Sequence, residues 1–364
     1  MKKIIIGAFA LAFAFTSAAR ADVAISGFFQ QIIGLGDDTT GGITHEFDRI
    51  NFVASTTTDN GWEVGGKLQH EPTLDRTAGP TALQMHITND LGTLVLGNTT
   101  DAVTNTISRI AAMVPGGGTD AGYQYLFFSA TQGDRGVRFA EAYYAMNGHR
   151  AVYTPPSING INLSISYTPS HDFNTMSARA RTAQGSHGQI HQETLEIAAN
   201  YSGELEGIGY TIALGSKNGN GIASFQDGND LNVLTGTIKL TQGAWAVGYH
   251  IYENGDSYGA NTDSTKASSH GYNVALTHAT GNIVIGVGYS EQEAVNGTKF
   301  NSATAGGNLT GVQSTNITNI GISYNLGGGV GTYIQMSDYD INDGNADTTE
   351  VSPQVIFAGI SLGF

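Results

Sequence analysis

The stretch LTGTIKLTQGAWAVGYHI, residues 234–251, contains the pattern that decides the fold. A large apolar residue stands at nearly every second position on both sides of a short turn at Gln242 and Gly243. Alternation with a period of two is typical of a β-strand with one apolar face, and glycine in a tight turn is typical of a hairpin. The stretch therefore predicts a β-hairpin with these residues on its apolar face: Leu234, Ile238, Leu240, Trp245, Val247, Tyr249 and Ile251.

The same pattern recurs from one end of the chain to the other. Further hairpins are predicted at 49–55 with 62–69, 83–87 with 94–96, 151–153 with 161–167, 195–201 with 208–214, 272–276 with 283–289, and 320–324 with 330–336. Single strands at 25–33 and 356–364 open and close the series. We therefore expect an all-β chain of about 16 antiparallel strands, an even number as in bacterial outer-membrane barrels.

The two faces of these strands have opposite characters. Aromatic residues on the apolar face cluster near strand ends, as expected at two lipid–water interfaces: Trp62, Tyr153, Tyr201, Tyr210, Trp245, Tyr324 and Phe364 beside short turns, and Tyr167, Tyr272 and Tyr289 beside long loops. The other face is polar, and unpaired polar groups in a dry interior cost a few kcal/mol each. An apolar outside and a polar inside predict a transmembrane β-barrel around a water-filled pore, with short periplasmic turns and long extracellular loops.

The first 21 residues predict a secretory signal peptide. Met1-Lys2-Lys3 is a positive region, 4–15 is an uncharged apolar run, and Ala19-Arg20-Ala21 has the small-x-small pattern of a cleavage site. The apolar run is too short for a transmembrane helix, which needs about 20 residues. We expect a mature chain that starts at Asp22 and forms one domain, 22–364.

The charge balance narrows the classes of partner. The chain has 16 Lys and Arg against 31 Asp and Glu, and loss of Lys2, Lys3 and Arg20 would leave 13 bases and a net charge of −18. Nucleic acid is not an expected partner, because phosphate binding needs a basic surface. The absence of cysteine excludes disulfides and thiolate metal sites.

Several short motifs resemble the general diffusion porins of Gram-negative bacteria, in particular the alphaproteobacterial, Rhodobacter-like type. They are Val23-Ala24-Ile25-Ser26-Gly27, the segments 47–66 and 91–97, Tyr324-Asn325-Leu326-Gly327-Gly328-Gly329, and Ser361-Leu362-Gly363-Phe364. The resemblance implies a barrel of 16 strands in the outer membrane, a homotrimer surrounded by lipid and lipopolysaccharide, and the passage of ions and small hydrophilic solutes. It also implies that the terminal Phe364 is an assembly signal.

The resemblance further implies that the third long loop, about 98–148, folds inward and narrows the pore. On the pore wall the matching positions are Arg49, Lys67, His86 and Arg150. On the loop, candidate constriction acids are Asp101, Asp120, Asp134 and Glu141, beside Arg109, Arg135 and Arg138. The Pro-Glu-Phe signature of enterobacterial third loops is missing, which leaves open which acids form the constriction. The surplus of acids predicts a cation-preferring pore.

Two other functions remain as alternatives: a barrel adhesin or structural protein, and a barrel hydrolase. Ten histidines are scattered over loops and strand ends, but no Gly-x-Ser-x-Gly elbow and no His-Glu-x-x-His pair occurs. The long third loop argues against a purely structural barrel. No enzyme activity and no cofactor are expected.

One acidic segment is a weak candidate for a divalent cation. Asp338, Asp340, Asn342 and Asp343 place oxygen ligands at nearly alternate positions. The segment fails the register of an EF-hand, because Gly344 comes one residue late and Thr349 stands where the closing Glu belongs. An acidic solvated loop is the favoured interpretation.

Overall fold

The computed structural model describes residues 22–36, 41–44, 48–71, 82–118, 148–170, 191–221, 230–255, 257, 268–295, 312–342 and 352–364. Within these ranges no helix is long and apolar enough to cross a membrane. Nearly all of the described chain is antiparallel β-strand, as the alternating pattern predicts.

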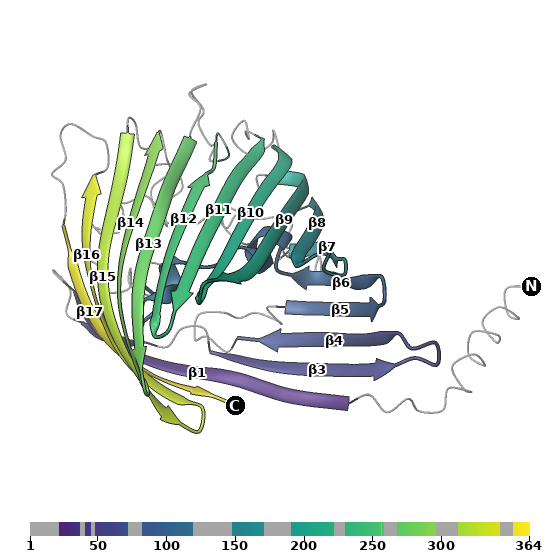
Figure 1. Cartoon of the computed structure of the whole chain (residues 1–364), viewed down its shortest axis with the longest axis horizontal. Coiled ribbons are helices and arrows are strands. Elements are labelled where there is room, and N and C mark those ends of the chain that lie inside the picture. The colour runs from purple at the N-terminus through teal and green to yellow at the C-terminus, as the bar shows by residue number, and fades with distance from the viewer. Residues whose placement is uncertain are drawn as a thin grey trace, which may run out of the picture.

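The strands form one closed ring (Figure 1). They are β1 (Asp22–Gly36), β2 (Gly42–Thr44), β3 (Arg49–Thr57), β4 (Glu63–His70), β5 (Ala82–Asn89), β6 (Gly92–Thr99), β7 (Gly148–Thr154), β8 (Ile161–Ser170), β9 (His191–Leu205), β10 (Ile208–Gly221), β11 (Leu231–Gln242), β12 (Trp245–Glu253), β13 (Ser268–Thr280), β14 (Ile283–Val295), β15 (Val312–Gly327), β16 (Val330–Asn342) and β17 (Gln354–Gly363). Both β2 and β3 pair with the same side of β1, at Ile32–Gly34 and Asp22–Phe28 respectively. They count as one interrupted strand, so the barrel has 16 strands and the prediction is confirmed.

The hairpin at 234–251 folds as expected. Gln242 pairs with Trp245 across the turn, and Gly243 has a φ of 56°, a left-handed conformation that glycine adopts without strain. The apolar face of the hairpin points outward: Leu234 is 63% exposed and Ile251 is 53% exposed. The polar Thr235 and His250 point inward, are buried, and form a 2.7 Å hydrogen bond between Oγ1 and Nε2. Exposed apolar and buried polar side chains are the arrangement suited to lipid outside and a polar interior.

The last residue seals the ring. Phe28 pairs with Gly363, and the backbone of Phe364 exchanges two hydrogen bonds with Gly27, with N–O distances of 2.8 Å and 3.1 Å. The Phe364 ring lies over Gly27 and packs against the Phe29 ring, with a centroid distance of 5.4 Å. Ring closure removes both sheet edges and pairs their backbone groups, which lipid could not hydrogen-bond.

The wall of the barrel is uneven in height. Strands β3–β7 have 7–9 residues each, whereas β9–β11 and β13–β16 have 12–16. Figure 1 shows β3–β6 as the short strands beside the taller wall of β9–β16. We call β3–β7 the low wall and β9–β16 the tall wall.

The third long loop leaves β6 after Thr99 and returns at β7, so its predicted ends near 98 and 148 are close to the observed ones. Its described part contains the short helix α2 (Ala102–Thr106) and the 3₁₀ turn η1 (Ala111–Met113). Helix α2 contacts β8, β9 and β10, whereas η1 contacts β13 and β14. The described part of the loop therefore folds into the barrel and follows the inner surface of the tall wall.

Candidate pore constriction

The low wall carries a row of basic side chains on its inner face. Lys67 lies directly opposite Gln84, Gln84 opposite Gly97, and Gly97 opposite Arg150. Directly opposite residues of neighbouring strands share one face of the sheet. Lys67 and Arg150 therefore face the same interior.

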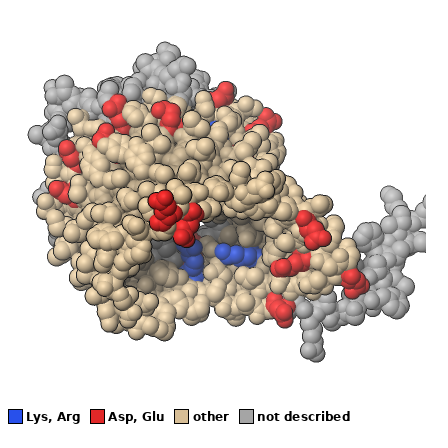
Figure 2. Space-filling model, viewed as in Figure 1, with Lys and Arg blue, Asp and Glu red and all other residues tan. Residues whose placement is uncertain are grey.

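Arg49 and His86 share this inner face, and each lies near an acid. The guanidinium of Arg49 is 3.7 Å from Glu71 Oε1, and its side chain is 38% exposed. Glu71 Oε1 also accepts a 2.9 Å hydrogen bond from Gln69 Nε2. His86 Nε2 lies 3.5 Å from Glu63 Oε1. Figure 2 shows basic atoms inside the hollow and acidic atoms along its edge.

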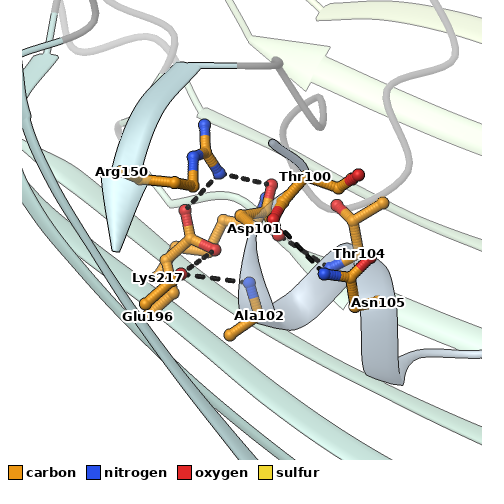
Figure 3. Close-up of polar contacts among 9 residues, drawn as sticks. Thr100, Asp101, Ala102, Thr104, Asn105, Arg150, Glu196 and Lys217 are labelled. Atoms are coloured by element: carbon orange, nitrogen blue, oxygen red, sulfur yellow. Dashed lines mark hydrogen bonds and ion pairs between the residues drawn. The ribbon is translucent and has the colours of Figure 1, made fainter. Parts of the chain in front are cut away.

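The start of the third loop is fixed to the wall by a buried ionic cluster (Figure 3), formed by Asp101, Arg150, Glu196 and Lys217. Asp101 Oδ2 lies 3.0 Å from Lys217 Nζ and 3.3 Å from an Arg150 guanidinium nitrogen. The same Arg150 nitrogen lies 3.8 Å from Glu196 Oε1. All four side chains are at most 3% exposed, so two acids and two bases are held together out of water.

Asp101 also begins helix α2. Its other oxygen, Oδ1, accepts a 2.7 Å hydrogen bond from the backbone N–H of Thr104, which is an N-cap interaction. The backbone N–H of Ala102 donates to Ser166 Oγ at 3.0 Å, and Ser166 Oγ donates to Glu196 Oε2 at 3.2 Å. The carboxylate of Asp101 thus joins the loop and its helix to β7 and β10, and the backbone of Ala102 joins them to β8.

The charge of Asp101 is stabilised in this cluster. Burial alone raises the pKa of a carboxyl group, but Lys217 and Arg150, together with the hydrogen bonds, outweigh that effect and hold the pKa of Asp101 well below its usual value. Asp101 is therefore a carboxylate at neutral pH.

The structure separates the expected constriction residues into three groups. Arg49, Lys67 and His86 lie on the inner face of the low wall. Arg150 and Asp101 meet in the buried ionic cluster, so Arg150 anchors the loop beneath the pore surface. The loop residues Asp120, Asp134 and Glu141, with Arg135 and Arg138, lie outside the described residues.

Sequence reasoning missed Glu196 and Lys217. Each is a single charged residue at an inward position of an alternating strand, between apolar residues on the outward face. That pattern is the available signal, because a charge facing inward needs either water or a partner. The identity of the partner depends on the path of the loop, which the strand pattern does not contain.

The described part of the acidic segment near 340 is extended strand rather than a curled loop. Asp338 and Asp340 lie on the outer face of β16, where extended backbone separates alternate residues by about 6.6 Å. Asn342 ends the strand, and Asp343 lies outside the described residues. No group of three or more potential His, Cys, Asp or Glu metal ligands occurs in the described part of the chain.

Comparisons with known proteins agree with this architecture. A family model described as Gram-negative porin matches residues 7–344. A porin structure refined at 1.8 Å resolution is 15% identical, with a TM-score of 0.64 over 94% of this chain and 100% of that one. The trimer form of OmpT from Vibrio cholerae is 11% identical, with a TM-score of 0.61 over 94% and 99%. The anion-selective porin from Comamonas acidovorans is 12% identical, with a TM-score of 0.60 over 95% and 100%.

These identities are low, so the structural likeness shows the fold alone. Among curated protein sequences no significant match is found.

Proposed function

Because this chain belongs to the Gram-negative porin family and forms a diffusion channel in the outer membrane, we propose that its pore passes cations more readily than anions. The family assignment makes the protein a channel rather than an enzyme or an adhesin. Ion preference depends on the side chains of this chain, which differ from those of the anion-selective Comamonas acidovorans porin at most positions.

The observation that carries the proposal is the charge at the long-loop ends of the strands. On β9 and β12–β16 the described ends bear acids and no Lys or Arg: Glu193 on β9, Glu253 on β12, Glu291 and Glu293 on β14, and Asp338 and Asp340 on β16. The bases near the same ends of other strands point into the barrel: Arg49 on β3, Lys67 on β4, Arg150 on β7 and Lys217 on β10. A negative rim concentrates cations at the mouth and repels anions. The excess of 31 acids over 16 bases in the whole chain acts in the same direction.

The interior bases offset this field only in part. Arg150 and Lys217 are buried in the ionic cluster beside Asp101 and Glu196 and do not face the pore water. Arg49 lies near Glu71, and His86 lies near Glu63. In the proposed constriction, Arg49, Lys67 and His86 face acids of the third loop, for which Asp120, Asp134 and Glu141 remain the candidates. Opposed charges across a narrow passage orient dipolar solutes and disfavour apolar ones.

The test is the reversal potential of the purified protein in a planar bilayer under a tenfold KCl gradient. We expect the sign of a cation-selective pore, and we expect the preference to weaken as salt rises, because the Debye length falls from about 10 Å at 0.1 M to about 3 Å at 1 M. An anion-selective sign, or no selectivity at low salt, would overturn the proposal.

The low wall supports a homotrimer as the working form. A strand that crosses the membrane in contact with lipid needs about 9–11 residues, and strands β4–β7 have only 7 or 8. A wall of this height fits best against other copies of the barrel. Unheated electrophoresis and chemical crosslinking of protein in outer membranes should give a trimer, and a monomer in both would contradict this assignment.

A further inference from the structure

The third loop lies against a row of glycines on the tall wall, and this contact is independent of the ionic cluster. Gly248 on β12 is directly opposite Ala275 on β13, which is opposite Gly288 on β14. Two residues before Gly288 on β14 and on the same face, Gly286 is directly opposite Gly321 on β15. The four glycines and Ala275 are therefore adjacent on one face of four neighbouring strands, and we call them the glycine track.

The loop occupies the space that side chains would fill on this track. A methyl group on Gly248 would lie 2.5 Å from Ile110 Cδ1, and one on Gly288 would lie 2.9 Å from Val114 Cγ2. Carbon atoms prefer separations of about 3.5–4.0 Å, so both contacts exclude a larger residue. Ile110 and Val114 are at most 1% exposed and form a buried cluster with Ala275.

The contact becomes closer toward β15. A methyl group on Gly286 would lie 2.9 Å from Pro115 Cδ, and one on Gly321 would collide with the carbonyl oxygen of Pro115. At Gly321 the loop approaches with its backbone, so no change of a loop side chain could relieve that collision. The path of the loop is thus determined most strictly near Pro115.

A side-chain amide holds the loop just beyond the track. Gln335 on β16 is directly opposite Gly321, and it is fully buried. Its Oε1 accepts a 2.9 Å hydrogen bond from the backbone N–H of Gly118, and its Nε2 donates a 3.0 Å bond to the Gly118 carbonyl. The described segment is therefore held at Asp101 by charge, at Gly118 by an amide, and between them by close packing.

From this geometry we propose that the glycine track and Gln335 set the cross-section of the pore. They let the segment 110–118 of the third loop lie close to the tall wall, so the distance between this segment and the low wall is as large as the fold allows. Adding a methyl group to the track moves the loop toward the lumen and narrows the passage. These are positioning residues: they act on solutes through the place of the loop. The inference rests on the channel function and not on the proposed cation preference.

The test adds side-chain volume to the wall and removes it from the loop. Gly288→Ala adds a methyl group to the track, and Val114→Ala removes the Cγ2 methyl group of the loop that it would meet at 2.9 Å. The only other close neighbour is the side-chain amide of Asn319 on the wall, which is the same in both variants. Gly288→Ala alone should lose single-channel conductance and admit only smaller sugars in liposome swelling, and the double variant should recover both. Gly331→Ala is the matched control. Gly331 also lies on the inner face of the barrel, on β16, and its added methyl group would lie 3.4 Å from Ser361 Oγ, an ordinary contact.

Recordings at about 1 M KCl report changes in pore size rather than in charge, because the Debye length there is only about 3 Å. A folded Gly288→Ala protein with unchanged conductance, or a double variant that recovers nothing, would overturn the proposal. If Gly288→Ala does not fold, Gln335→Ala supplies a second test without added bulk. Loss of the amide contact should let the loop move toward the lumen and give a smaller or fluctuating conductance, and a conductance equal to wild type in level and noise would overturn the proposal. The reversal potential at low salt tests the cation preference separately.

Discussion

Lys217 and Asp101 are 116 residues apart in sequence, yet Lys217 Nζ lies 3.0 Å from Asp101 Oδ2 in a site from which solvent is almost excluded. The lysine belongs to the wall and the aspartate to the loop, so this pair determines where the loop begins its path inside the barrel. Arg150 and Glu196 complete the cluster.

Asp101→Asn should release the beginning of the loop. Asparagine still caps a helix, so the substitution removes the charge and keeps the cap of α2. Breaking a buried ion pair by removing one partner typically costs about 3–5 kcal/mol. We expect lower thermal stability and a fluctuating single-channel conductance. Asp90→Asn, in the exposed turn between β5 and β6, is the control and should change neither property.

The contacts that hold the beginning of the loop at Asp101 should be lost only in strong acid. Arg150, Lys217 and Ser166 face Asp101 from β7, β10 and β8, and Glu196 faces it from β9. Because the native pKa of Asp101 lies below the unfolded value of about 3.9, its contribution to stability is fully present above about pH 4 and is lost as the pH falls through the lower native value.

Single-channel recordings at about pH 7 and about pH 5 should therefore show the same behaviour of the loop, with fluctuation appearing only in much stronger acid. A transition between those two pH values that disappears in Asp101→Asn would show that the pairing is weaker than its geometry indicates.

Lys67→Gln should strengthen cation preference. Lys67 is an inward base on the low wall, and its removal leaves the acids near the pore less compensated. We expect a larger reversal potential of the same sign at about 0.1 M salt, and a much smaller difference from wild type at about 1 M, because screening shortens the range of the charge. An equal change at both salt concentrations would mean that the substitution altered the pore shape instead.

Deletion of Phe364 should reduce assembly and leave conduction intact. The residue supplies the hydrogen bonds and ring contacts that seal β17 against β1 at Gly27 and Phe29. We expect less heat-modifiable barrel in the membrane, with normal conductance from the molecules that do fold. Phe364→Trp retains an aromatic ring and should restore much of the yield, whereas full yield from the truncated chain would contradict the prediction.

Cleavage of the signal peptide should leave Asp22 as the first residue, as the Ala19-Arg20-Ala21 pattern predicts. Asp22 is the first residue of β1 and pairs with Ser55 of β3, so cleavage before Asp22 leaves the paired part of β1 complete. N-terminal sequencing of protein extracted from outer membranes gives the answer directly, and a chain beginning at Met1 would refute the assignment.

The strand pattern predicts the wall of this barrel far better than its interior contacts. Alternation alone places Leu234 outside and Thr235 inside, because side chains in a strand point to opposite faces. It also places Lys67 and Arg150 on one face. It cannot show that Arg150 is covered by the loop, since that depends on where 100–118 lies in space. For the same reason the sequence gives no sign of a role for the glycines of the track, which there only lower strand propensity. Their role follows from the structure, in which Ile110, Val114 and Pro115 pack against them.

Pairing of β1 with both β3 and β17 gives the sheet no free end from which unzipping could start. Separation of any one strand must break two ladders of backbone hydrogen bonds at once, in a medium that offers no replacement partners. The barrel should therefore persist through a high barrier to unfolding, as kinetic stability, rather than through a large equilibrium stability. For a protein at the cell surface, where no ATP-driven refolding machinery operates, slow unfolding is the property that preserves function.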